Sequence, residues 1–295
     1  MKTAAYTLIL VALSSCGPSA DAPAQLLVPE ITAVYPGIVL PGSKLVIEGQ
    51  GFSQADAPDY QIALRTTDSM GSVTDRWLPV ASVQSRAIEG ADSGGLGRLL
   101  VEVERELWET LGQGSIQAEL VVVIDSGASS TRSPSFATAF EVWEYLEPGS
   151  PDAVAPSVAF VNDELVVSSK HMLLGGKEGT SYVRLRGCIE RGQDCEPIAE
   201  LDVELAPLAE FDRAVATFVW GPQIGGLEPG RFVGTAAVEN HHADGQVRGS
   251  SSSALAFELN PVALVGPVST AASLGQYIEL EGGGFVATGA SGATL

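Results

Sequence analysis

The sequence predicts an all-β protein built from successive β-sandwich domains, and three observations support this prediction. Short segments in which apolar and polar residues alternate recur along the chain, as on half-buried strands. Similar segments return at a spacing of roughly 115–120 residues, which is close to the size of one β-sandwich domain. The 295 residues include 33 Gly and 17 Pro, and only 18% are charged, a composition that favours many turns over long helices.

Residues 1–15 have the properties of a secretory signal peptide. Lys2 supplies a positive start, and residues 4–13 form an apolar run that is too short to span a bilayer. The segment ends in Leu-Ser-Ser-Cys at residues 13–16, which resembles the lipobox of bacterial lipoproteins. This resemblance implies cleavage before Cys16, acylation of its sulfur and attachment to a membrane through the lipid.

The residues after the lipobox bear on where such a protein would reside. Gly17 follows Cys16, rather than the Asp that retains some lipoproteins in the inner membrane, so we expect an outer-membrane or cell-surface location. Residues 16–27 are rich in Ala, Pro and Ser and suit a lipidated tether. The alternative is an ordinary signal peptide followed by an incidental cysteine.

Two segments near opposite ends of the chain match in register. The ending Glu-Gly-x-Gly-Phe is shared by Gly42–Phe52 and Gly275–Phe285. A weaker copy lies between them, where Leu165–Met172 aligns with Leu45–Phe52. Repetition of this kind predicts a chain of similar folding units.

The repeats predict the domain organisation of the chain. We expect a first domain over residues 28–146 and a second, divergent domain over residues 147–260. A third domain begins at residue 261, and residues 261–295 are too few to close a sandwich, so we expect this last domain to be truncated.

The repeated pattern resembles the IPT/TIG family of immunoglobulin-like domains. The resemblance rests on Pro-x-Ile followed by Gly-x-x-x-x-Ile-x-Gly-x-Gly-Phe at Pro29–Phe52. Pro261–Phe285 has the same pattern with Ala263 and Leu280 in place of the two Ile residues. The middle copy departs from it, because Ser169 and His171 replace the glycines and Met172 replaces the Phe. The resemblance implies tandem immunoglobulin-like β-sandwich domains, of the kind that serve as spacers, as protein-binding modules, or beside polysaccharide-active domains.

The opening motif has a direct physical interpretation. Leu45 and Ile47 alternate with polar neighbours, as on a half-buried strand, and Pro41-Gly42 before them favours a turn. Gly49 and Gly51 permit positive φ or close backbone approach, and Phe52 is placed to fill the end of a core. The other expected strands are rich in β-branched or alternating residues: Arg98–Val103, Glu119–Ile124, Val158–Val167, Ala214–Trp220 and Val233–Val238. One short helix is expected over Arg105–Gly112.

Two of the three cysteines remain once Cys16 is assigned to the lipid. Cys188 and Cys195 flank a turn-like Arg-Gly-Gln-Asp segment, so they are expected to join as a disulfide across a hairpin in an oxidising compartment. The alternative is two unpaired, unreactive thiols. The spacing is not Cys-x-x-Cys, which argues against a redox site.

The sequence contains no recognisable catalytic, metal or cofactor motif, and we expect no enzyme activity. Only His171, His241 and His242 are present, and the predicted first domain has none, which excludes a Ser-His-Asp set there. His241 and His242 with Asp244 form a weak metal candidate, but adjacent side chains of a strand face opposite ways. A polar loop over residues 240–249 is the favoured interpretation.

Two further groups of residues are weighed as binding sites. Acidic residues near the first predicted boundary have oxygen ligands that suit calcium, but solvated surface is the simpler explanation: Glu144, Glu147, Asp152, Asp163 and Glu164. The four tryptophans would stack on sugars if exposed, although a Trp in a β-sandwich is more often part of the core: Trp77, Trp108, Trp143 and Trp220.

The charge balance limits the classes of partner. With 16 Lys+Arg against 36 Asp+Glu the formal net charge is -20, which disfavours nucleic acid and direct adsorption to anionic lipid. We therefore expect a lipid-anchored cell-surface protein whose domains serve as a stalk or a protein-interaction module. The alternative is a carbohydrate-binding or polysaccharide-processing accessory protein, with a protein or glycan ligand that the sequence leaves unknown.

Overall fold

The structure is a computed structural model. It describes residues 28–52, 59–67, 70–86, 96–125, 130–209, 211–221, 224, 227–261, 263–267, 271, 273–275 and 280–283. The predicted signal peptide, the tether over residues 16–27 and Cys16 lie outside the described residues, as does Phe285 of the last repeat.

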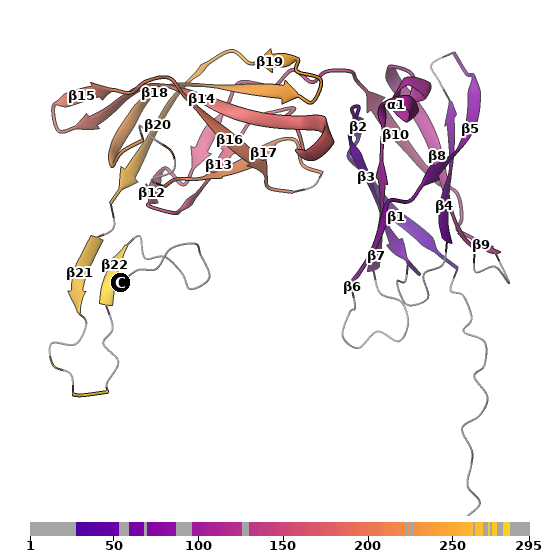
Figure 1. Ribbon diagram of the computed structural model, residues 1–295, viewed down its shortest axis with the longest axis horizontal. Coiled ribbons are helices and arrows are strands. Elements are labelled where there is room, and N and C mark those ends of the chain that lie inside the picture. The colour runs from indigo at the N-terminus through magenta and orange to yellow at the C-terminus, as the bar shows by residue number, and fades with distance from the viewer. Residues whose placement is uncertain are drawn as a thin grey trace, which may run out of the picture.

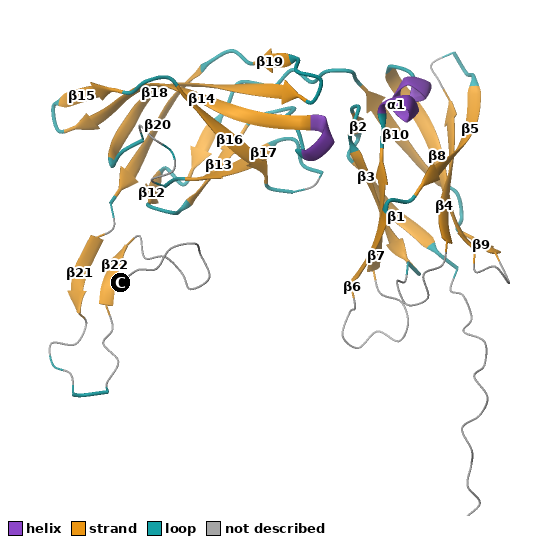
Figure 2. Cartoon of the chain, in the orientation of Figure 1, coloured by secondary structure: helices purple, strands orange, loops and turns teal. Residues whose placement is uncertain are grey.

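The described chain is mostly β-strand with one short α-helix, and its strands surround two separate hydrophobic cores (Figures 1 and 2). We call the part over residues 30–142 the first β unit and the part over residues 153–260 the second β unit. In Figure 1 the strands of the second unit run across the direction of the strands of the first.

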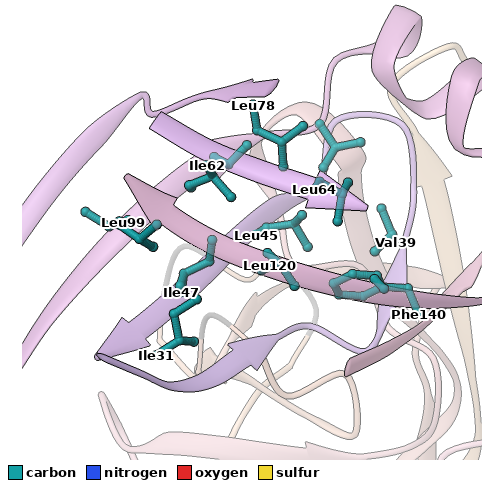
Figure 3. Close-up of a cluster of buried hydrophobic side chains, with 14 of the residues drawn as sticks. Ile31, Val39, Leu45, Ile47, Ile62, Leu64, Leu78, Leu99, Leu120 and Phe140 are labelled. Carbon is teal, nitrogen blue, oxygen red and sulfur yellow. The ribbon is translucent and has the colours of Figure 1, made fainter. Parts of the chain in front are cut away.

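Two sheets enclose the core of the first β unit, in the orders β1-β3-β7-β6 and β2-β10-β8-β4-β5, with β9 paired to β8. Their strands are β1 (Glu30–Tyr35), β2 (Ile38–Val39), β3 (Lys44–Gln50), β4 (Asp59–Thr67), β5 (Val73–Pro79), β6 (Ser82–Arg86), β7 (Leu96–Glu102), β8 (Gly114–Asp125), β9 (Ser130–Arg132) and β10 (Phe136–Val142). Inward-facing side chains from both sheets meet in this core, including Leu45, Ile62, Leu99, Leu120 and Phe140 (Figure 3).

The opening motif folds as its residues predict. Leu45 and Ile47 of β3 are buried, and Phe52 fills the end of the core. Gly51 has a φ of 76°, and a Cβ on Gly49 would lie 2.2 Å from the carbonyl oxygen of Glu30. These two glycines are therefore required by backbone conformation and by close approach.

The predicted helix is α1 (Arg105–Leu111), which connects β7 to β8. Its Trp108 and Leu111 are buried against the core of the first unit. Gly112 ends it with a φ of 79°, as a helix-terminating glycine does.

The second β unit has its own core and one continuous path of strands, β11-β13-β17-β16-β14-β18-β20-β12, with β15 on β14 and β19 on β18. The path turns at β16, which pairs with β14 at one end and with β17 at the other. The elements are β11 (Ala153–Ala155), β12 (Val158–Phe160), β13 (Glu164–Ser168), the 3-10 turn η1 (Gly176–Glu178), β14 (Gly179–Arg191), β15 (Asp194–Pro197), β16 (Leu201–Pro207), β17 (Val215–Val219), β18 (Gly230–His242), β19 (Val247–Gly249) and β20 (Ser253–Asn260).

The two units repeat one pattern of strand pairing. Each opens with an antiparallel pair, β1–β3 and β11–β13, and each pairs its next strand in parallel with its last strand, as β2–β10 and β12–β20. Leu45 and Leu165, which the repeat aligns, are both buried in β3 and β13. The Tyr35–Pro36 and Ala155–Pro156 peptide bonds, both cis, stand at the same place in the two units.

Two predictions about the second unit are wrong in detail. The expected strand over Val158–Val167 is split into β12 and β13, because Asn162 has a φ of 70° and the Asp163 carboxylate accepts the Phe160 N–H at 2.7 Å. The expected polar loop over residues 240–249 is instead the end of β18, a turn, and β19. Strand pairing with β14 and β19 outweighs the polar composition of this segment.

The described residues beyond the second unit form the antiparallel pair β21 (Ala263–Pro267) and β22 (Leu280–Gly283). These strands contain parts of the repeat that starts at residue 261. Residues 284–295 lie outside the described part of the chain.

Candidate functional site at the junction of the two units

A buried ion pair lies where the two β units meet, which we call the junction. Glu178 and Arg213 are 3% and 7% exposed, and the guanidinium donates to both carboxylate oxygens at 2.7 and 2.8 Å. The Ser43 hydroxyl of the first unit donates to the same carboxylate, and the Leu174 N–H donates to it at 3.0 Å. Such a set of donors compensates the desolvation of a buried carboxylate.

The first unit also supplies a hydrogen-bond acceptor to the arginine of this ion pair. Arg213 donates to the Ile38 carbonyl oxygen of the first unit at 3.1 Å and to the Met172 carbonyl oxygen of the second unit at 3.2 Å. Ser43 and Ile38 both come from the chain that leads from β2 into β3. The ion pair is therefore shared between the units through its hydrogen bonds.

A small apolar cluster seals the junction. We call residues 143–152, which connect β10 to β11, the linker. Leu40 of the first unit, Leu146 of the linker and Leu173 of the second unit are all buried and pack together, with Ile38 against them. This burial stabilises the contact between the units because it removes apolar surface from water.

The backbone of the linker forms two hydrogen bonds with side chains of β18. The Leu146 N–H donates to Nε2 of His242 at 3.3 Å, and the Leu146 carbonyl oxygen accepts from the amide of Asn240 at 2.9 Å. Burial lowers the pKa of His242, which favours the neutral imidazole that can accept this hydrogen bond. Tyr145 packs edge-on against the His242 ring and donates its hydroxyl to Asp244 at 2.9 Å.

The two backbones approach closely at one glycine. Gly42 has a φ of 88°, and a Cβ there would lie 2.2 Å from the Lys177 carbonyl oxygen of η1. Lys177 also forms exposed ion pairs across the junction with Glu102 and, at 3.6 Å, with Glu104. On another side of the junction the rings of Tyr35 and Phe211 are 4.5 Å apart.

Two clefts flank this contact, with volumes of about 370 and 340 Å³. The first has a mixed charge and is lined by Arg105, Glu144, Tyr145, Lys177, His242 and Asp244, among others. The cations in it already face carboxylates, since Arg105 pairs with Glu144 at 3.1 Å and Lys177 pairs with Glu102. The arrangement is suited to fixing the two units relative to each other, and its charges are committed to internal pairs.

The residues that the sequence proposed for metal binding are not brought together. Within the described ranges no group of three or more His, Cys, Asp and Glu side chains is placed to hold a metal ion. The His241 ring packs at a tilt against Tyr182, while His242 faces the junction, as expected for neighbours on a strand. Asp163, one of the acidic residues weighed for calcium, caps the turn between β12 and β13.

Cys188 and Cys195 lie on β14 and β15 and are joined as a disulfide, with their Cα atoms 5.5 Å apart. The hairpin also contains an exposed ion pair between Arg191 and Glu196 at 3.3 Å. This part of the second unit belongs to the edge of the molecule in Figure 1 and is remote from the junction.

The expectation that the tryptophans belong to the cores holds for two of the four. Trp108 and Trp220 are buried, and each donates its indole N–H to a carbonyl oxygen at 3.1 Å. Trp77 and Trp143 are 58% and 47% exposed. Trp77 is on β5, one position before the buried Leu78, so its side chain lies on the outer face of the sheet, and Trp143 directly follows β10.

The residues of the junction do not stand out in the amino-acid sequence. Glu178 stands in the segment Gly175-Gly-Lys-Glu-Gly179, and nothing in this pattern distinguishes it from the many exposed acidic residues. Its partner Arg213 is 35 positions away and Ser43 is 135 positions away.

The part of the chain that the structure describes contains no helix that is long and apolar enough to cross a membrane.

No family model matches the chain, and no curated protein matches it. Among solved structures, it is similar to the dimeric latent PorU from Porphyromonas gingivalis at 14% identity and a TM-score of 0.27, over 80% of this chain and 21% of that one. A tetra-tandem repeat from the extending region of a large adhesion protein matches at 15% and 0.23, over 80% of this chain and 50% of that one. The ectodomain of the teleost fish polymeric Ig receptor matches at 13% and 0.26, over 79% and 98%.

These likenesses are too distant to support an argument about function. The chain spans about a fifth of the PorU chain and half of the adhesion-protein repeat. The IPT/TIG resemblance accordingly remains a prediction that rests on the quoted residues.

Proposed function

We propose that this chain is an exported, lipid-anchored surface protein whose tandem immunoglobulin-like domains form a stalk or a protein-interaction module. The domains are those expected over residues 28–146 and 147–260, followed by the start of a third, and no catalytic activity is assigned to them. The lipobox-like segment at residues 13–16 supports the anchor through Cys16.

The observation that carries the stalk proposal is the junction. A flexible pair of domains would be joined by an exposed linker with few contacts. Here the units are connected by a buried ion pair, by a buried apolar cluster and by two hydrogen bonds between the Leu146 backbone and side chains of the second unit. A fixed angle between domains is what a spacer needs to hold its outer end at a set distance from a membrane.

The anchor is tested in the native host by comparing the wild type with Cys16→Ala. Intact mass and membrane partitioning are measured for both proteins. Acyl groups on the wild type and its exclusive recovery in the membrane fraction support the proposal. If both proteins are soluble and carry a plain cleaved terminus, the anchored stalk is rejected.

A carbohydrate-binding accessory role is the second candidate, and the exposure of Trp77 favours it. Exposed aromatic rings provide apolar faces on which sugars can stack. This role is compatible with the stalk, because a spacer can present a binding face.

A further inference from the structure

The outer face of the sheet β2-β10-β8-β4-β5 carries an exposed aromatic ring next to small side chains. Trp77 of β5 is directly opposite Ala63 of β4, and Ala63 is opposite Val121 of β8, so the three side chains share one face. Ala63 and Val121 are half-buried, whereas Trp77 is 58% exposed. The indole therefore stands at the end of a shallow apolar row.

Polar side chains flank this row on both sides. The neighbouring row contains Arg65 opposite Asp75, joined by hydrogen bonds of 2.7 and 3.2 Å. The row on the other side contains the exposed Gln61. Rows on one face of a strand are about 7 Å apart, so donors and acceptors lie roughly one sugar ring away from the indole. We call Gln61, Ala63, Arg65, Asp75 and Trp77 the Trp77 face.

The edge of β5 argues against addition of another strand. In the described sheet β5 is the last strand, and Arg76 points to its inner side, where Nη1 is buried without a hydrogen-bond partner. Pro79, which has no N–H, ends the strand. An inward charge and a proline are both devices that prevent edge pairing. Trp77 is thus exposed on the outer face of the sheet, next to a sheet edge that is protected against pairing with another strand.

The size and charge of the surface argue against a second copy of the chain. A stable interface buries about 800 Å² per partner, whereas one aromatic side chain supplies about 150–250 Å². Two copies with a net charge of -20 each also repel one another, and the same charge repels polyanions. A small, uncharged ligand fits both limits.

We propose that the Trp77 face binds a sugar ring of a neutral polysaccharide. The apolar face of the ring stacks on the indole, and its hydroxyls hydrogen-bond to the Gln61 amide and to the Asp75 carboxylate. Each carboxylate oxygen of Asp75 accepts one hydrogen bond from Arg65 and retains a lone pair for a hydroxyl donor. The ion pair also fixes the orientation of the carboxylate. This inference rests on the carbohydrate-binding candidate above and assigns its site and ligand class, and it does not depend on the stalk or on the lipid on Cys16.

Affinity electrophoresis of the mature chain tests the proposal. Native gels contain soluble β-glucan, mannan, xylan or dextran, and alginate serves as the anionic control. The variants are Trp77→Ala, Trp77→Tyr and, as a matched exposed tryptophan far from the Trp77 face, Trp143→Ala. Thermal unfolding of each variant establishes that it is folded.

We expect at least one of the four neutral polysaccharides to retard the wild type and Trp143→Ala equally. Trp77→Ala should bind that polysaccharide at least tenfold more weakly, and Trp77→Tyr should retain part of the affinity because its ring still stacks. Alginate should retard none of them. The proposal is overturned if no neutral polysaccharide retards the wild type or if Trp77→Ala binds as the wild type does. It is also overturned if light scattering shows a dimer of the wild type that Trp77→Ala abolishes.

Discussion

Single residues at the junction form buried contacts whose loss should lower the stability of the protein. Replacing Arg213 with Met leaves the Glu178 carboxylate buried without its counter-ion, which is expected to cost about 3–5 kcal/mol of unfolding free energy. The measurement is chemical denaturation of the mature chain. Replacing both members, with Glu178→Gln and Arg213→Met together, should restore much of this loss.

The matched control is an ion pair of the same geometry on the surface. Arg65 and Asp75 are paired through two hydrogen bonds, but both side chains are more than half exposed. Arg65→Met should therefore change the stability far less than Arg213→Met. Equal losses in the two variants would contradict the importance assigned to the buried pair.

Gly42 provides a second test at the scale of one residue. An Ala at this position would place its Cβ 2.2 Å from the Lys177 carbonyl oxygen and should push the two units apart. Gly71 has a similar φ of 83°, but a Cβ added there would meet no atom within 4 Å, so Gly71→Ala imposes the same backbone cost without the clash. X-ray scattering in solution should report a wider distribution of shapes for Gly42→Ala alone.

At the scale of elements, the linker is hydrogen-bonded to the end of β18. The folded protein lowers the pKa of His242 by burial, so the neutral imidazole stabilises the fold above the ordinary histidine pKa. This contribution is lost as the pH falls below about 6.5 through the lowered pKa. Protonation puts a hydrogen on Nε2, which then faces the Leu146 N–H.

This pH dependence can be separated from that of other groups. The charged groups around His242 are Asp244, Glu178 and Arg248, and they are unchanged in His242→Asn. The asparagine still offers an acceptor but does not titrate. Between pH 7.5 and 5, the wild type should lose more thermal stability than His242→Asn. Equal losses of thermal stability in the wild type and in His242→Asn would contradict a stabilising role of the neutral His242 imidazole.

The Cys188–Cys195 hairpin is a second element with a testable contribution. A disulfide that closes so short a loop is expected to contribute about 2–3 kcal/mol. Cys188→Ser with Cys195→Ser should therefore leave the fold intact and mainly increase hydrogen exchange in β15. A global loss of structure in this variant would contradict a local role.

The elements could be predicted because their information is local. The spacing of Leu45, Ile47 and Phe52 predicts β3 and the closed end of the core, and Leu107, Trp108 and Leu111 predict α1. The turn at Asn162 was missed because a positive φ at a residue other than glycine is uncommon and depends on its surroundings. Strand pairing likewise overrode the polar composition of residues 240–249.

The junction could not be predicted because its information is not local. Ser43, Glu178 and Arg213 meet only after two cores have formed, and each looks like an ordinary polar surface residue in the sequence. The exposure of Trp77 is of the same kind. It depends on which side of the sheet faces the second layer, and this follows from register rather than from composition.

At the scale of the whole molecule, the junction predicts one angle between the units. Its main contacts are buried and are screened little by salt, whereas the exposed Lys177 pairs are screened strongly. The scattering profile of the mature chain should therefore stay the same between low and high salt. A profile that expands with salt would indicate that the exposed pairs hold the angle.

The parallel pairs β2–β10 and β12–β20 have a mechanical consequence. In each unit they join a strand near the chain's entry to the strand at its exit, side by side and in the same direction. A pull on the two ends of a unit draws these strands past each other, so their hydrogen bonds are strained together rather than opened one by one. In each unit the parallel pair therefore resists tension along the chain by shear. When the chain is stretched, the two units should unfold in separate, abrupt steps rather than gradually.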